Sequence, residues 1–205
     1  MGVRVESMVM GPVATNCYYL YEEGSGHAAV IDPPVKGEWI FEHLKKKGFS
    51  VDAILLTHGH FDHISGVEAL KRKSGATVYA PLAEKELLLD PSRNLSDEGI
   101  RLTADRYLED GETFSAADIP VRFILTPGHT IGSGCYYLEE DKILFSGDTL
   151  FEGSVGRTDL PTGSASSLLK SVKEKLMGLP DDVLVLPGHG MRSTIQDERM
   201  YNPFL

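Results

Sequence analysis

The most informative segment of this chain is Thr57-His58-Gly59-His60-Phe61-Asp62-His63. It holds three of the seven histidines of the 205-residue chain, and three imidazoles and one carboxylate fall within six residues. The apolar run before it, residues 53–56, is typical of a buried strand, so the segment predicts a metal-binding loop at a strand end. A donor set without cysteine suits Zn, Fe or Mn in a working site better than a closed structural site.

Three further strand ends repeat this arrangement. Apolar runs at residues 123–125, 143–145 and 183–186 are each followed by a small residue or Pro-Gly and then by His129, Asp148 and His189. A buried strand is rigid, and a neighbouring glycine allows a sharp turn, so each side chain can be held firmly. His129 or His189 alone would more often be an ordinary histidine. Because four strands share one pattern, we expect their ends to meet at a common rim.

Seven donors are too many for one tetrahedral ion and suit two ions that share a bridging carboxylate. Asp148 stands alone after its strand and is the natural bridge. We expect the remaining donors to divide into two sets: His58, His60 and His129 for one ion, and Asp62, His63 and His189 for the other. We expect the two divalent ions to be Zn, although the same donors accept Fe or Mn.

Composition narrows the classes of function that this chain could have. The formal net charge is −10, which disfavours nucleic-acid binding because phosphates are bound by clustered Lys and Arg. No apolar run approaches the ~20 residues of a membrane-spanning helix, and residues 1–10 lack the features of a signal peptide. We therefore expect a cytoplasmic protein that binds neither nucleic acid nor membrane. Cys17 and Cys135 lie in apolar runs, and we expect small buried thiols rather than nucleophiles.

The rest of the chain alternates strand and helix signals. We expect strands at residues 3–10, 16–21, 28–31, 53–56, 77–80, 121–125, 135–138, 143–145 and 183–186, and helices at residues 38–47, 65–73, 81–89 and 164–177. Ser65 is the expected N-cap of the second helix, and Trp39, Ile40 and Leu44 mark the first as amphipathic. Residues 90–107 have no strong period, and we expect a mobile loop that could cover a binding site. Consecutive strands with occasional helices favour sheets covered by helices, an α+β fold.

The His-x-His-x-Asp-His loop with distant His, Asp and His closely resembles the metallo-β-lactamase superfamily, and the resemblance extends from Asn16 to the end of the chain. It implies an αββα sandwich of two mixed sheets flanked by helices, with the same seven ligands around a dinuclear site.

Further segments resemble the short glyoxalase II-like hydrolases, which cleave S-acyl-glutathione thioesters: Thr126–Thr130, Gly147–Phe151, Gly156–Asp159, Pro187–Gly190 and Glu198–Leu205. The chain would be a single domain over residues 1–205, too short for the C-terminal helical domain with which glyoxalase II grips glutathione. Where that family has a lysine and a nearby tyrosine, this chain has Arg157 and Asp159. Arg157 could still bind a substrate carboxylate.

The resemblance implies hydrolysis of a small-molecule thioester, such as S-lactoylglutathione, by metal-bound hydroxide. Asp62 would orient the hydroxide as well as bind metal. Thr57 and Thr130 are candidates for hydrogen bonds that turn the ligand imidazoles correctly, although both could be simple turn residues. Arg157 is either a substrate contact or half of a structural salt bridge.

Several alternatives stay open. A persulfide dioxygenase shares the fold and a Gly-Arg-Thr-Asp segment like residues 156–159, but it uses a single iron and consumes oxygen. A β-lactamase would carry an export signal, and a nuclease would require a basic surface. A non-catalytic metal-binding protein belongs to another class, and structural zinc sites favour closed cysteine-rich sets. The metal, the acyl group, the thiol and the oligomeric state cannot be predicted from the sequence.

Overall fold

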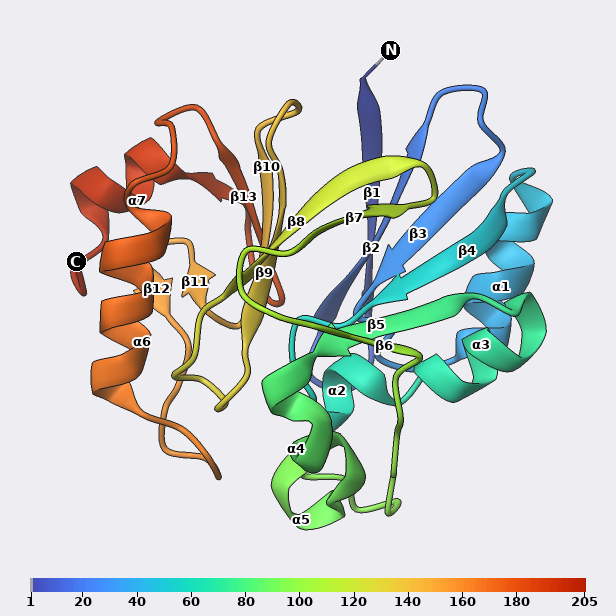
Figure 1. Ribbon diagram of the computed structural model, residues 1–205, viewed down its shortest axis with the longest axis horizontal. Coiled ribbons are helices and arrows are strands. Elements are labelled where there is room, and N and C mark those ends of the chain that lie inside the picture. Colours follow the sequence, from blue (N-terminus) through green and yellow to red (C-terminus); the bar gives the residue numbers. More distant parts are fainter. Residues whose placement is uncertain (1) are drawn as a thin grey trace.

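The computed structural model describes residues 2–205 and contains two six-stranded sheets packed face to face (Figure 1). The first sheet has the strand order β1-β2-β3-β4-β5-β6. Its strands are β1 (Val3–Met10), β2 (Thr15–Glu22), β3 (His27–Ile31), β4 (Ser50–Leu55), β5 (Thr77–Pro81) and β6 (Arg106–Leu108). Strands β1 to β3 pair antiparallel and strands β3 to β6 pair parallel, so the sheet is mixed.

The second sheet has the order β14-β13-β10-β9-β8-β7. Its strands are β7 (Thr113–Ala116), β8 (Ile119–Leu125), β9 (Gly134–Leu138), β10 (Ile143–Gly147), β13 (Leu184–Pro187) and β14 (Ser193–Thr194). Only β10 and β13 pair parallel, so this sheet is mixed too. A separate hairpin of β11 (Leu150–Phe151) and β12 (Ser154–Val155) follows β10.

Helices lie on the outer faces of both sheets (Figure 1). The helices are α1 (Gly37–Lys46), α2 (Phe61–Ile64), α3 (Val67–Ser74), α4 (Lys85–Leu89), α5 (Pro91–Asn94), α6 (Ala165–Ser171) and α7 (Ile195–Tyr201). In Figure 1, α1 and α3 flank the first sheet and α6 and α7 the second, whereas α2, α4 and α5 lie beyond the ends of the strands. A 3₁₀ turn, η1 (Leu82–Glu84), precedes α4, and a π-helical turn, η2 (Val172–Leu176), continues α6. Within residues 2–205, none of these helices has the length and hydropathy needed to cross a bilayer.

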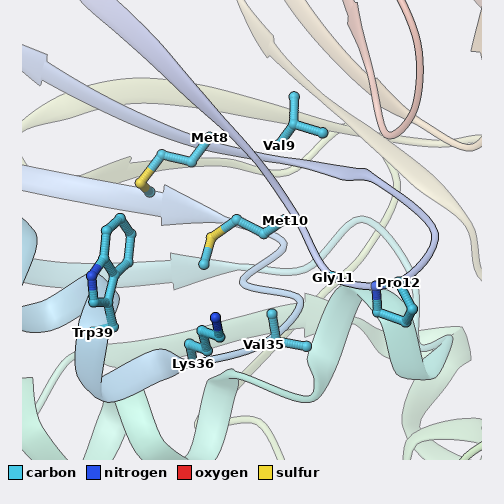
Figure 2. Close-up of a pocket in the computed structure, with 8 residues that line it drawn as sticks. All are labelled: Met8, Val9, Met10, Gly11, Pro12, Val35, Lys36 and Trp39. Atoms are coloured by element: carbon cyan, nitrogen blue, oxygen red, sulfur yellow. The ribbon is translucent and has the colours of Figure 1, made fainter.

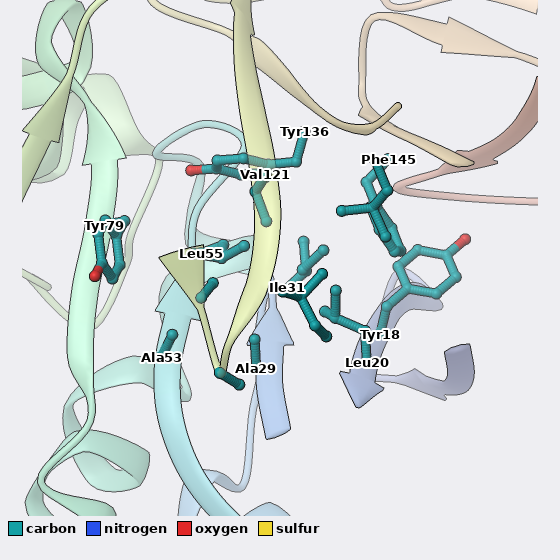
Figure 3. Close-up of a cluster of buried hydrophobic side chains, with 14 of the residues drawn as sticks. Tyr18, Leu20, Ala29, Ile31, Ala53, Leu55, Tyr79, Val121, Tyr136 and Phe145 are labelled. Carbon is teal, nitrogen blue, oxygen red and sulfur yellow. The ribbon is translucent and has the colours of Figure 1, made fainter. Parts of the chain in front are cut away.

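The two sheets share a core because their strands alternate. In Figure 3, Tyr18 and Leu20 of β2 and Ile31 of β3 face Tyr136 of β9 and Phe145 of β10. The intervening residues face outward, where a second apolar cluster packs under α1 and α3 and a third under α6. The period of two along each strand therefore supplies both faces of each sheet. The predicted αββα sandwich is confirmed.

The predicted N-cap and the predicted start of the second helix were wrong. Ser65 is not an N-cap: it ends α2, and its hydroxyl donates to Phe61 O at 2.6 Å. The Asp62-His63 turn is itself helical, so α3 begins as a separate helix after Gly66.

The expected loop at residues 90–107 contains α5 and ends in β6. Asn94 closes it, because its buried side-chain amide donates to Ile100 O at 2.9 Å.

Trp39 also departs from the prediction of an amphipathic helix. Ile40 and Leu44 of α1 are buried, but Trp39 is half exposed and stacks on His43, with ring centroids 5.0 Å apart. Figure 2 shows Trp39 beside Met8 and Met10 of β1, at a hollow on the edge of the first sheet. Residues 40 and 44 share one helix face and residues 39 and 43 share the next, so only the first pair reaches the core.

Candidate metal centre

The four strand ends singled out in the sequence converge at one rim between the sheets. The segment after β4 carries His58 and His60 and enters α2, and the segments after β8, β10 and β13 carry His129, Asp148 and His189. The start of β2 crosses to the second sheet here, since Thr15 forms a β-bridge with His189 and the Asn16 N–H donates to Gly188 O at 2.7 Å. The structure thus brings all seven predicted donors together.

The first group of donors is His58, His60 and His129, one ligand atom of each lying within 4.8 Å of the others. His60 Nδ1 and His129 Nε2 are 2.9 Å apart, and all three rings are buried. Burial, reinforced by neighbouring imidazoles, lowers the pKa of His58 well below its ordinary value and that of His60 to about 3. Both rings are therefore neutral at pH 7, the form that binds a metal ion.

The second group is Asp62, His63 and His189. Asp62 Oδ2 lies 3.2 Å from His189 Nε2 and 3.4 Å from His63 Nε2. Burial alone would raise the pKa of Asp62, but the two imidazoles outweigh it and hold that pKa well below its ordinary value. Burial alone would lower the pKa of His63, and the surrounding carboxylates reverse the shift. This group therefore favours positive charge, whether a proton or a metal cation.

Asp148 lies between the two groups. Its Oδ2 is 3.5 Å from His129 Nε2 of the first group, and its Oδ1 is 3.5 Å from His63 Nε2 of the second. Gly188 makes room for this carboxylate, because a Cβ there would stand 2.2 Å from Asp148 Oδ1. One carboxylate facing both groups has the geometry of a bridge between two ions.

Unsatisfied polar atoms test whether the site fits a metal. In the part of the chain that the structure describes, His58 Nε2, His60 Nε2 and Asp148 Oδ1 are buried without a hydrogen-bond partner. Buried polar atoms are rarely left unpaired, since each one costs about 1–3 kcal/mol. His60 presents Nδ1 rather than Nε2 to His129, so the test rests on His58 Nε2 and Asp148 Oδ1. A cation satisfies acceptors of this kind, so the residues present fit divalent ions.

Asp32 is a buried carboxylate that the sequence analysis missed. It accepts hydrogen bonds from the Thr57 N–H at 2.8 Å, the Thr57 hydroxyl at 2.6 Å and His63 Nδ1 at 2.9 Å. This leaves His63 Nε2 to face Asp62 and Asp148. Asp32 also groups with His58 and His63 as a potential metal triad, but its bonds to Thr57 and His63 identify it as a positioning carboxylate. Its place just after β3 repeats the strand-end pattern and could have revealed it.

The two threonines behave differently. Thr57 Oγ1 lies 3.1 Å from His58 Nδ1 and donates to Asp32, so it can orient His58 with Nε2 directed into the site. Thr130 bonds Ser133, with 2.6 Å between the hydroxyl oxygens, and no bond to a ligand imidazole is found for it within residues 2–205. The expected orienting contact therefore exists for Thr57 and is absent for Thr130.

A cavity of about 580 Å³ opens onto the two groups. One side is formed by the donor residues His60, Asp62, His129, Asp148 and His189. The remaining wall is mostly apolar and is formed by Val13, Phe61, Leu95, Phe151, Val155 and Leu160. Leu95 comes from the segment expected to cover a binding site, and it does line this one. The cavity thus combines a polar floor with apolar walls, as small-molecule sites do.

Arg157 lines the same cavity and is exposed. Its guanidinium forms a forked pair with Asp159, Nε to Oδ1 and Nη2 to Oδ2 both at 2.8 Å. The hydrogen bond from Arg157 lowers the pKa of Asp159 to about 2. The Arg157 carbonyl meanwhile accepts from His129 Nδ1 at 2.8 Å, which directs His129 Nε2 into the site. The backbone of Arg157 thus serves a donor residue, while its side chain is at the rim.

Comparisons with known proteins find relatives along nearly the whole chain. The family model described as "Metallo-beta-lactamase superfamily" matches residues 10–189. A Bacillus subtilis protein named "Probable metallo-hydrolase YqgX" is 39% identical over 203 residues, which are 97% of this chain and 95% of the relative. The "Hydroxyacylglutathione hydrolase GloC" of Haemophilus influenzae is 30% identical over 212 residues, with 99% of this chain and 98% of the relative covered.

Solved structures are also similar to this chain along nearly its whole length. The crystal structure of the BLEG-1 B3 metallo-beta-lactamase superimposes with a TM-score of 0.92 at 38% sequence identity, covering 98% of this chain and 99% of that one. The crystal structure of TTHA1623 in a di-iron-bound form superimposes with a TM-score of 0.83 at 34% identity, covering 98% and 100%. The similarity therefore includes both sheets and the segments that carry the seven donors.

Proposed function

This chain belongs to the metallo-beta-lactamase superfamily, and on that premise we propose that it is a dinuclear metal-dependent hydrolase of small thioesters such as S-lactoylglutathione. One observation carries the proposal: two groups of three donors face each other across Asp148. A structural site would be closed, whereas these donors line an accessible cavity. Zn is the ion we propose first, with Fe supported by the di-iron neighbour.

The thioester substrate is supported by a relative and by the chemistry of the cavity. The relative from Haemophilus influenzae is named a hydroxyacylglutathione hydrolase, and it matches over 98% of its length. The apolar walls suit an acyl group, and Arg157 at the rim suits an anionic thiol half. The titratable groups lining the cavity are the donor residues and Arg157, so no spare general acid is available among the described residues. A thioester needs none, because thiols have a pKa of about 8.5 and leave as thiolates.

The residues of the chain would divide the work. Two divalent ions, when bound, would provide a hydroxide near neutral pH and stabilise charge on the carbonyl oxygen. Asp62 can orient that nucleophile, since its Oδ2 also accepts from the Thr15 hydroxyl at 3.2 Å and is thereby held in place. Asp148 sets the separation of the two groups, and the walls formed by Phe61 and Phe151 limit the access of bulk water.

The central test compares His58→Ala and Asp148→Ala with the wild type. Each variant should lose bound metal, and hydrolysis of S-lactoylglutathione should fall by at least about 10²–10³-fold, the effect of removing a group that stabilises developing charge. Elemental analysis and thiol release would be measured on the same samples. His43→Ala is the matched control, because His43 stacks on Trp39 rather than lining the cavity. Full activity of either site variant would refute the proposal.

A second candidate reaction is hydrolysis of a β-lactam. It is favoured by the structural neighbour described as a B3 metallo-beta-lactamase, which is 38% identical to this chain. Lactam cleavage, and oxygen uptake with glutathione persulfide, would be measured on the same metal-loaded protein. These assays separate both reactions from thioester hydrolysis. We expect thioester turnover to exceed both. Faster lactam cleavage would replace the proposed substrate while leaving the metal centre intact.

Arg157 is proposed to bind the anionic part of the substrate. Arg157→Ala should raise KM roughly 10-fold or more, the worth of a charged hydrogen bond, with a smaller change in kcat. Asp159→Asn separates the two roles of the side chain, because it breaks the ion pair but leaves the guanidinium available. We expect that variant to keep a KM near or below the wild-type value. A KM unchanged in Arg157→Ala would remove Arg157 from the binding site.

A further inference from the structure

Glu84 is a fully buried carboxyl group at the junction of η1 and α4, outside the cavity. Its Oε2 accepts from the Gly59 N–H and its Oε1 from the Gly132 N–H, both at 2.7 Å. Gly59 lies between His58 and His60, and Gly132 lies three residues after His129. One carboxylate therefore binds the backbone of both segments that carry the first group of donors.

Gly59 and Gly132 show how closely the Glu84 carboxyl group packs between their two segments. A Cβ at Gly59 would stand 2.6 Å from Leu87 Cδ2 and 3.2 Å from Glu84 Oε2. A Cβ at Gly132 would stand 2.7 Å from the Ala83 and Glu84 backbone. A side chain at Gly132 would meet the backbone of η1, just before α4, and one at Gly59 would meet the side chains of Leu87 and Glu84. Both segments therefore pack closely against η1 and α4, with the Glu84 side chain as the link.

The chemistry of the link requires a carboxylate. Both bonds are donated by backbone N–H groups, so the side chain must accept at both oxygens. A glutamine would turn its NH₂ group toward one of the two N–H donors and lose that bond. Burial raises the pKa of Glu84, and hydrogen bonds from Thr130, Gly59 and Gly132 oppose the shift. No ion pair to Glu84 is found within residues 2–205, so these hydrogen bonds, two of them from backbone N–H groups, compensate its burial.

We propose that Glu84 is a positioning residue that sets the spacing of His58 and His60 relative to His129, and thereby the affinity and geometry of the ion bound by that group. The inference rests on the proposed assignment of these histidines as metal ligands. Ligands held by a rigid support bind an ion in a defined geometry, and loss of such support typically costs 10–100-fold in metal affinity.

The other group has supports of its own. His63 is held by Asp32 and Asp62 by the Thr15 hydroxyl, whereas Glu84 bonds Gly59 and Gly132 and no residue of α2, where Asp62 and His63 lie. A change at Glu84 should therefore act on one ion rather than on both. This asymmetry separates a positioning role from a general contribution to folding.

The test uses Glu84→Gln and the matched control Glu86→Gln. Glu86 is exposed, lies two residues further along in α4, and within residues 2–205 forms only a 3.5 Å surface ion pair with Arg93. Co²⁺ binding to the metal-free proteins would be titrated against a competing chelator and followed by the Co²⁺ absorption spectrum. In Glu84→Gln we expect one of the two equivalents to bind about 10–100-fold more weakly with an altered spectrum, and the other equivalent to bind normally. Glu86→Gln should match the wild type.

The outcomes are distinct. Failure of the wild type to bind two equivalents would overturn the proposed metal centre, and the assignment of Glu84 with it. Normal binding of both equivalents in Glu84→Gln, or equal weakening of both, would overturn the positioning role alone.

A measurement on the wild type covers the case in which Glu84→Gln does not fold. The Gly59 and Gly132 amide protons should exchange slowly with deuterium in both the metal-free and the metal-loaded protein, because each is bonded to a buried carboxylate. Rapid exchange of either amide would overturn the inference.

Discussion

Asp32 shows how one residue can connect a proposed ligand to the rest of the fold. It has a positive φ of 48° and lies just after β3. Its two oxygens accept three hydrogen bonds, from the backbone and hydroxyl of Thr57 and from the ring of His63. The carboxylate thus selects the tautomer of His63 and holds the start of the histidine loop against the first sheet.

Asp32→Asn should weaken most the ion bound by Asp62, His63 and His189, because Asp32 bonds His63 directly and His58 only through Thr57. Asparagine tolerates a positive φ as aspartate does, so the backbone can stay while one acceptor oxygen becomes an amide donor. We expect affinity for that ion to fall roughly 10–100-fold, measured by Co²⁺ titration. Asp52→Asn, at an exposed carboxylate paired with His27, is the control. Wild-type affinity for both ions in Asp32→Asn would contradict the assigned role.

The two cysteines should be unreactive in the folded protein. Both are fully buried, and burial raises the pKa of both thiols, that of Cys135 to about 11. A thiol titrates to its reactive thiolate as pH rises through its pKa, so at pH 8 both remain protonated. A chromogenic disulfide reagent should modify no thiol at pH 8 in buffer and two per chain in guanidinium chloride. Native reaction with a midpoint near the ordinary thiol pKa of about 8.5 would contradict this expectation.

At the scale of elements, the β11–β12 hairpin is too short to be stable alone and is held by the C-terminal segment. The buried Glu198 carboxylate on α7 accepts from the Gly153 N–H at 3.0 Å and from the Asn202 side chain at 2.7 Å. Asn202 also donates to Ser154 O at 3.0 Å. The hairpin contributes Phe151 and Val155 to the cavity wall, so α7 indirectly shapes that wall.

Asn202→Ala should therefore loosen the hairpin. It removes the bonds to Ser154 and Glu198, and we expect a loss of about 1–3 kcal/mol in the free energy of unfolding, since Glu198 loses a buried partner. KM for the thioester should rise while bound metal stays at two equivalents, because no donor residue lies on the hairpin. Denaturant unfolding, steady-state kinetics and elemental analysis measure these quantities. Gln196→Ala, at an exposed amide on the same helix, is the control, and equal behaviour of the two variants would exclude the tether.

At the scale of the whole molecule, each group of donors draws on both sheets. His58 and His60 follow β4 of the first sheet, whereas His129 follows β8 of the second. In the other group, Asp62 and His63 lie on α2, which continues from the first sheet, and His189 follows β13 of the second. Ions bound by these groups would join the two halves of the sandwich.

Removal of metal should therefore lower the thermal stability of the whole fold. A ligand that binds only the folded state at 1,000 times its Kd stabilises that state by about 4 kcal/mol. For a chain of this length that corresponds to a shift in Tm on the order of 10 °C. Differential scanning fluorimetry before and after chelation, with elemental analysis of each sample, would measure the shift. An unchanged Tm after complete removal of the metal would show that the ions do not join the two sheets.

The sequence was sufficient where the signal is local. Strands were predicted because short runs of residues are apolar or alternate, and the seven candidate donors were found because they fall in the four segments that follow such strands. Among the missed elements, β14 and the β11–β12 hairpin have two-residue strands that carry no periodic signal, and the C-terminal helix α7 was missed as well. Trp39 was misplaced because a helical pattern shows which residues could face a core but not how wide that core is.

The sequence by itself thus determined the sandwich of two sheets and the candidate donors at the strand ends. Only the tertiary structure decided which carboxylates hold these donors in place: Asp32 for His63, Glu84 for the segments on either side of the first group, and Glu198 for the cavity wall. An isolated acidic residue looks in sequence like any solvated one. Apart from Asn202, which is four residues from Glu198, the partners lie 25 to 48 residues away along the chain, so burial and these bonds exist only once distant segments have packed together.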